Sequence, residues 1–157
     1  MFVTGADVHF KCSFPYLALI KWAGAGESAI PARVISAGCG LAAVAAAYLL
    51  VKRVFGEWPG RLAALLLAVY PHHIYLSRLA GPASAGFLFF VLALYFTWRI
   101  YRGETGPAAA AGYFLSMIAG LCLHYHAALV LLPANILFYG FAASRRRNIY
   151  WWTVANL

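Results

Sequence analysis

The 157-residue sequence predicts an all-α integral membrane protein with about five transmembrane helices plus a short extracytoplasmic interfacial helix. Composition is the first reason: 64% of the residues are hydrophobic and 10% are charged, with a mean hydropathy of +0.78, so the polar residues are too few to cover a water-soluble domain. The second reason is the spacing of the charges. It leaves apolar runs close to the roughly 20 residues that cross a bilayer as a helix.

The chain divides into three parts. Residues 1–30 form an extracytoplasmic loop in which a helix beginning near Pro15 is too short to cross the membrane and is expected to lie on its surface. Residues 31–147 form the transmembrane helical core. Residues 148–157 read as the truncated start of a further helix, so we expect the chain to be a fragment of a larger membrane protein.

Charge-free stretches define the spans of the core. The charge-free runs of residues 34–51, 62–77 and 79–98 each indicate one span, and residues 105–144 are long enough for two. The second span is expected to return outward to Pro71. The turn-rich "VFGEWPGR" is expected to be a loop between the first two spans, "GPASAG" the turn before the third, and Pro107 the start of the fourth. Small residues line one face of the first span, which predicts close packing in a bundle: Ser36, Gly40, Ala43 and Ala47.

Basic residues indicate the orientation of these spans. Eight fall on one side of the predicted topology: Lys52, Arg53, Arg61, Arg99, Arg102, Arg145, Arg146 and Arg147. Four fall on the other: Lys11, Lys21, Arg33 and Arg78. The asymmetry predicts a multi-pass protein of the cell membrane with the side of Lys52 and Arg145 cytoplasmic. The net charge of +8 does not indicate nucleic acid, because no soluble module carries the basic residues.

Histidines gather on the opposite, extracytoplasmic half of this topology. They are His9, His72, His73, His124 and His126, and Arg78 lies with them. An arginine beside several imidazoles can bind an anionic headgroup, because its planar guanidinium matches phosphate oxygens. The same residues, and Arg33, could instead be anchors at the level of the lipid headgroups.

The sequence offers few residues for binding a metal ion or for acting as a catalytic carboxylate. His124 and His126 point to different faces of a helix and could chelate together only from a broken backbone, so no metal site is predicted. Asp7 and Glu27 are the acidic residues of the outer side. Asp7 is the candidate general base, and the alternative is a solvated loop residue.

Three stretches resemble the GT-C superfamily of polyprenyl-phosphate-sugar glycosyltransferases, closest to its protein mannosyltransferase and lipid A sugar transferase branch. "FPYLALIKWAGAGESAIPARVISAGCG" is similar to the surface helix and following span, with matches at Pro15, Tyr16, Gly26, Ser28 and Arg33. "LLLAVYPHHIYLSRLAGPASAGFLFFVLALYFTWR" is similar to the next pair of spans, with a Ser-Arg-x-Ala element at Ser77, Arg78 and Ala80. "GLCLHYHAALVLLP" is similar to a segment where a Lys or His faces the site, here His126.

The resemblance implies that a polyprenyl-phosphate-linked sugar is bound in the bilayer at the outer face, with a carboxylate activating the acceptor. Arg78, His72 or His73, and His126 would then hold the leaving phosphate, and Arg33 is a further candidate for binding the carrier. The cofactor is unknown, and the resemblance leaves open a divalent metal in the full-length protein. Pro82, Ala83 and Ser84 replace an Asp that many relatives carry after the Ser-Arg element.

Two further expectations concern activity. Asp7 lies only eight residues before Pro15, closer than the family's catalytic aspartate, so we expect this fragment alone to be inactive. The alternatives are an oligosaccharyltransferase-like subunit, a transporter or flippase whose polar groups line a transit path, and an assembly subunit without chemistry.

Overall fold

The computed structural model describes Tyr16, Ala18, residues 30–104 and residues 106–123. In these residues the regular structure is entirely helical. Its helices are α2 (Ile30–Phe55), α3 (Glu57–Val69), α4 (Pro71–Arg78), α5 (Ala83–Tyr101) and α6 (Pro107–Leu123). Tyr16 and Ala18 also have helical backbone.

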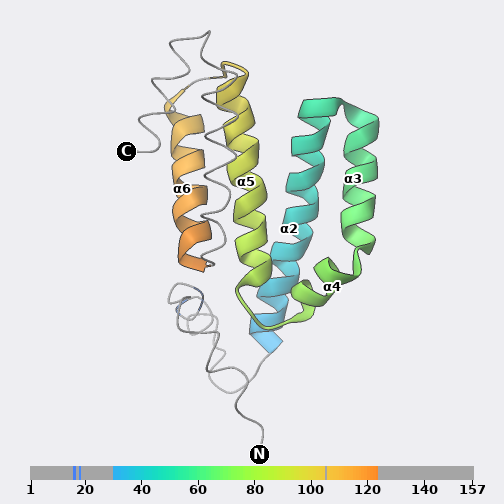
Figure 1. The fold of residues 1–157 in the computed structure, drawn as a ribbon. Coiled ribbons are helices and arrows are strands. Elements are labelled where there is room, and N and C mark those ends of the chain that lie inside the picture. The colour runs from blue at the N-terminus through green and yellow to red at the C-terminus, as the bar shows by residue number, and fades with distance from the viewer. Residues whose placement is uncertain (1–15, 17, 19–29, 105, 124–157) are drawn as a thin grey trace, which may run out of the picture.

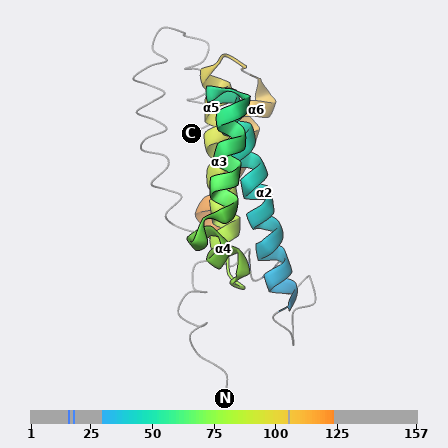
Figure 2. The ribbon, with the colours of Figure 1, turned by 90° about the vertical axis from the view of Figure 1, so that its right-hand side faces the viewer.

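The long helices stand side by side in the order α3, α2, α5 and α6 (Figure 1). Neighbouring helices of this row run in opposite directions, except that α2 and α5 run in the same direction, because α3 and α4 lie between them in the chain. The short α4 crosses the lower end of α2. Seen edge-on in Figure 2, the helices overlap within a narrow band. Along the direction of the helix axes, the row therefore has two ends. One end holds the α2–α3 and α5–α6 turns, and the other, called the α4 end below, holds α4.

The first turn differs from the expected loop over "VFGEWPGR". Only Gly56 separates α2 from α3, and its φ of 103° is a left-handed value that glycine adopts without strain. Pro59 lies in the first turn of α3, where the missing N–H has no helical partner to lose. Gly60 then lets α3 approach α2, because a Cβ there would lie 3.0 Å from the Lys52 Cβ.

The charge-free run of residues 62–77 is divided between two helices, and the break between them falls at the expected outer end of the second span, Pro71. Tyr70 has an extended backbone, with φ −67° and ψ 118°, and α4 starts at Pro71. A residue before proline is disfavoured in the helical region, which explains the break at Tyr70. α3 has 13 residues and covers about 20 Å, less than the hydrocarbon thickness of a bilayer.

Packing is densest between α5 and α6. Its buried residues are Ala93, Ile100, Ala109, Ala110, Tyr113 and Met117. Gly112 allows the approach, because a Cβ there would lie 2.5 Å from the Phe96 ring. A second cluster near the α4 end joins Tyr16 to Ala85 of α5 and Leu123 of α6. The predicted small-residue face of α2 is confirmed at Ser36, Gly40 and Ala43, which are all buried.

Two of the described helices, α2 and α5, are long and apolar enough to cross a membrane, and α6 is a shorter apolar helix. Large apolar side chains remain exposed along the outer faces of α2, α3 and α6. On α3 they are Trp58, Leu62, Leu65, Leu66 and Val69. Such an exterior suits lipid better than water. The all-helical membrane class is thus supported, whereas the number of spans stays a prediction.

Several boundaries also differ from the expected ones. α2 extends four residues before and after the expected first span of residues 34–51, and the third span begins at Ala83 instead of Leu79. The predicted start of the fourth span at Pro107 is confirmed. The interfacial helix apart from Tyr16 and Ala18, the fifth span and residues 148–157 lie outside the described residues.

Candidate functional site

α4 carries the polar residues that the sequence singled out. Its packing depends on Gly40 of α2, where a Cβ would overlap the Ser77 hydroxyl and lie 2.8 Å from the Ser77 Cβ. Ser77 in turn donates a hydrogen bond of 2.8 Å to the His73 carbonyl one turn earlier. Glycine at position 40 therefore brings α4 into direct contact with the backbone of α2.

The two adjacent histidines have different environments. His73 is 8% exposed and packs against the Phe87 ring of α5 at a centroid distance of 5.6 Å. Its Nε2 faces Gly40, at 3.8 Å from the position of a Cβ there. His72 is exposed. Of the two, His72 is the one that a ligand outside the helix row can reach directly.

An exposed row of side chains runs along the outer face of α4. His72, Tyr75 and Arg78 are spaced three residues apart, and all three are exposed. The His72 and Tyr75 rings are stacked, with centroids 6.5 Å apart and planes at 28°. Tyr70 adds an edge contact to His72 at 6.3 Å. Sequence reasoning missed Tyr75, although its three-residue spacing from His72 and Arg78 was readable once residues 71–78 were known to be helical.

The turn after Arg78 is attached to α2 through Ser36. The Ser36 hydroxyl donates a hydrogen bond of 3.0 Å to the Gly81 carbonyl, and the Gly81 N–H lies 3.4 Å from the same hydroxyl oxygen. The Tyr16 hydroxyl lies 2.9 Å from it. Ser84 of α5 donates a bond of 2.9 Å to the Ser36 carbonyl. The sequence predicted Ser36 only as a small packing residue.

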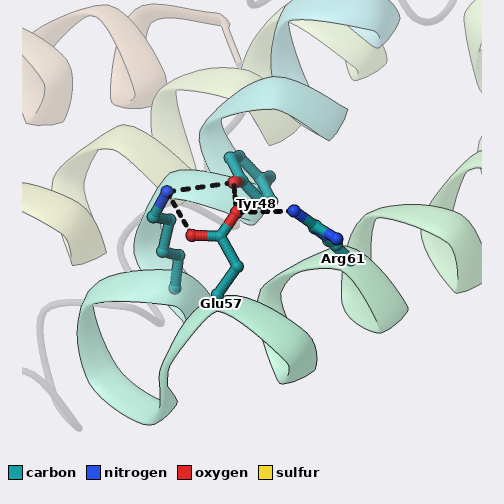
Figure 3. A network of polar contacts seen from close by, with 4 residues as sticks. Tyr48, Glu57 and Arg61 are labelled. Atoms are coloured by element: carbon teal, nitrogen blue, oxygen red, sulfur yellow. Dashed lines mark hydrogen bonds and ion pairs between the residues drawn. The ribbon is translucent and has the colours of Figure 1, made fainter.

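The opposite end of the helix row holds both described carboxylates. Figure 3 shows Glu57 among Tyr48, Arg61 and the ammonium of Lys52, which is 2.6 Å from its Oε2. The hydrogen bond from Lys52, followed by that from Tyr48, lowers the pKa of Glu57 to about 2. Glu104 pairs with Arg53 at 2.7 Å and with Arg99 at 2.9 Å, and the bond from Arg53 is the main cause of its lowered pKa.

Arginines at the α4 end have no such partners among the residues that the structure describes. Arg33, in the first turns of α2, and Arg78, the last residue of α4, are both exposed, and neither forms an ion pair within the described part of the chain. No described contact joins Arg33 to Arg78. At the glutamate end, four of the five described cations pair with a carboxylate and Arg102 does not, whereas at the α4 end neither described guanidinium has a carboxylate partner among the described residues.

Two sequence-predicted residues lie outside the described residues, Asp7 and His126. Their position relative to Arg78 stays a prediction. The described residues hold no group of three His, Cys, Asp or Glu side chains placed to bind a metal ion. The divalent metal of the full-length protein therefore also stays an expectation.

Comparison with known proteins gives one match. A family model described as dolichyl-phosphate-mannose-protein mannosyltransferase covers residues 13–155. Neither the curated proteins nor the solved structures yield a match.

Proposed function

This chain belongs to the dolichyl-phosphate-mannose-protein mannosyltransferase family, and from that membership we propose that it transfers a sugar from a polyprenyl-phosphate carrier to an acceptor at the extracytoplasmic face. The family indicates a membrane glycosyltransferase of the GT-C kind. The carrier, the acceptor and the side of the membrane belong to the proposal. The activity of the intact protein also belongs to the proposal.

Arg78, which forms no ion pair within the described part of the chain, is the observation that carries the proposal. It is the C-terminal residue of α4, it is exposed, and both described glutamates lie at the other end of the helix row. A guanidinium without a carboxylate partner keeps its donors available for two oxygens of a phosphate. At the edge of an apolar row of helices, that phosphate would be the headgroup of a lipid carrier.

The reaction has a simple charge balance. The acceptor oxygen bonds to the anomeric carbon of the sugar while the bond from that carbon to the phosphate oxygen breaks. The polyprenyl phosphate leaves with both bonding electrons and gains one negative charge, and the acceptor loses its proton to a base, for which Asp7 is the candidate. Arg78 would stabilise the departing charge more than the ground state, which is how a fixed cation accelerates such a step.

Neighbouring residues support the same assignment. His72 can donate a hydrogen bond to a phosphate oxygen, and the stacked Tyr75 ring offers an apolar face between it and Arg78. His73 is buried behind them and would act through packing. Arg33 and His126 remain candidates for a second contact with the carrier.

Arg78 provides the direct test, made in the intact membrane protein at matched expression. Arg78→Lys keeps the charge and loses the planar two-point contact, so transfer from a defined polyprenyl-phosphate-mannose donor should fall by roughly 10- to 150-fold, the range for a charge-assisted hydrogen bond. Arg102→Lys is the matched control, because Arg102 is exposed at the opposite end and has no ion pair in the described residues. It should leave transfer unchanged.

The results also separate the alternative functions. Wild-type activity in Arg78→Lys would make Arg78 a headgroup anchor, since lysine can also extend its charge to the interface. Movement of the carrier across vesicles without sugar transfer would favour a transporter or flippase. The absence of both activities in the intact protein would favour an assembly subunit.

A further inference from the structure

Ser36 is the point where three separate segments of the chain meet. It is 0% exposed and lies in the second turn of α2. Its hydroxyl contacts Tyr16, from the segment before α2, and Gly81, from the turn between α4 and α5. These contacts bridge 20 and 45 residues of sequence, so they depend on the tertiary fold and not on local structure.

The hydroxyl of Ser36 uses its full hydrogen-bonding capacity. A serine hydroxyl has one proton and two acceptor sites. The proton goes to the Gly81 carbonyl at 3.0 Å, and the Gly81 N–H approaches the oxygen at 3.4 Å. The Tyr16 hydroxyl lies 2.9 Å from the Ser36 oxygen and 3.3 Å from the Ala32 carbonyl, so its one proton is shared between these two acceptors. The Ser36 hydroxyl thus donates to the carbonyl and accepts from the N–H of the same residue, Gly81, which an alanine at position 36 cannot do.

Arg78 lies between two attachments to the same helix. Before it, Ser77 packs on Gly40, and after it, Gly81 is bonded to Ser36. Ser36 and Gly40 are four residues apart on the buried face of α2, which is about 6 Å along the helix axis. The backbone of Arg78 is thus held on both sides, whereas its side chain is exposed.

We propose that Ser36 is a positioning residue that fixes the place of the Arg78 guanidinium relative to the carrier phosphate. The inference rests on the proposed function, in which Arg78 binds that phosphate. Without the Ser36 hydroxyl, the Leu79–Pro82 turn loses its attachment to α2, and Arg78 can shift with it. A guanidinium displaced by about 1 Å makes weaker hydrogen bonds to a phosphate that is held in a fixed position.

Ser84 supplies a matched control for packing alone. It is 1% exposed and donates a hydrogen bond of 2.9 Å to the Ser36 carbonyl, so it also joins two helices at this junction. Its hydroxyl has no contact with the turn after Arg78 in the described residues. Ser84→Ala should therefore cost a similar amount of stability without moving Arg78.

The experiment measures equilibrium binding of a short-chain polyprenyl phosphate to the intact protein in lipid nanodiscs. We expect Ser36→Ala to weaken binding by about tenfold, the lower end for loss of a charge-assisted contact, and Ser84→Ala to stay within about twofold of wild type. In an Arg78→Lys background, Ser36→Ala should have a much smaller effect, because residues that act through one contact are not additive. Ser36→Cys preserves the volume with a weakly bonding thiol and gives the same test if Ser36→Ala fails to fold.

Each other outcome overturns a defined part of the proposal. If Ser36→Ala weakens binding no more than Ser84→Ala, or weakens it equally in the Arg78→Lys background, Ser36 has only a packing role and the proposed function stands. If the wild-type protein binds no polyprenyl phosphate, the proposed function fails, and this inference fails with it.

Discussion

Arg53 of α2 and Glu104 of the α5–α6 turn form two hydrogen bonds, of 2.9 and 2.7 Å, across 51 residues of sequence. Arg99 of α5 donates to the same carboxylate at 2.9 Å. The Arg53 guanidinium also lies 5.3 Å from the centre of the Tyr95 ring. One glutamate thus ties the ends of α2 and α5 together at the end of the row away from α4.

We expect Glu104→Gln to destabilise the protein by up to about 1 kcal/mol, because the pairs are partly exposed and such pairs are individually weak. Thermal unfolding of the protein in nanodiscs measures the change, and high salt should reduce it. Arg102→Gln, which removes an exposed arginine of the same turn outside this network, is the control. Equal effects of the two substitutions would show that the ion pairs of Glu104 add no stability of their own.

Glu57 predicts how stability depends on pH. Its pKa in the folded protein is about 2, against an ordinary value of 4.5, so the ionised form is favoured by folding. A lowered pKa contributes stability that is fully present above the ordinary value and is lost as pH falls from about 4.5 towards 2. The unfolding temperature of Glu57→Gln should therefore change less than that of wild type across this interval. Parallel acid transitions in the two proteins would contradict the role of Glu57.

Proline and glycine signals predicted part of this fold and misplaced another part. Pro107 correctly marked the start of α6. Pro71, the expected outer end of the second span, marks the break between α3 and α4. The glycines and proline of "VFGEWPGR" suggested a loop, but only Gly56 lies outside α2 and α3. Hydropathy measures whether a segment suits lipid, and it does not register a break in the backbone.

The candidate site was predictable as a set of residues and not as an arrangement. The sequence placed His72, His73 and Arg78 on one half of the protein, and the structure puts all three on α4. It could not show that His73 is buried and His72 exposed, since both environments depend on how α4 packs on α2 and α5. The contact between Ser36 and Gly81 was likewise hidden, because it joins residues 45 positions apart.

Membrane sidedness gives a further prediction. Trp58, in the first turn of α3, is 74% exposed, and Leu79, directly after α4, is 42% exposed. The α2–α3 turn and α4 lie at opposite ends of the row (Figure 1). In a background without Cys12, Cys39 and Cys122, we expect a membrane-impermeant maleimide to label Leu79→Cys on intact cells. It should label Trp58→Cys only after permeabilisation. The reverse pattern would place Arg78 in the cytoplasm and remove the extracytoplasmic site from the proposal.

Gly40 and Gly38 lie two residues apart on α2 and offer a matched pair for the final prediction. A Cβ at Gly40 would overlap Ser77, whereas a Cβ at Gly38 would meet no atom within 4 Å. Gly40→Ala should destabilise the protein by about 1–3 kcal/mol, the usual cost of overpacking. Gly38→Ala should be neutral or stabilising by up to about 1 kcal/mol, because alanine is the better helix former.

The same pair separates stability from function. Because the overlap at Gly40 falls on Ser77, its relief would push α4 and Arg78 away from α2. Gly40→Ala should therefore weaken binding of polyprenyl phosphate at a temperature where the variant is still fully folded, and Gly38→Ala should leave it unchanged. The unfolding temperature and the affinity for polyprenyl phosphate, measured for both variants, separate an effect on stability from an effect on binding. A Gly40→Ala protein that is less stable but binds the carrier as wild type does would show that the position of α4 on α2 does not set the geometry of Arg78.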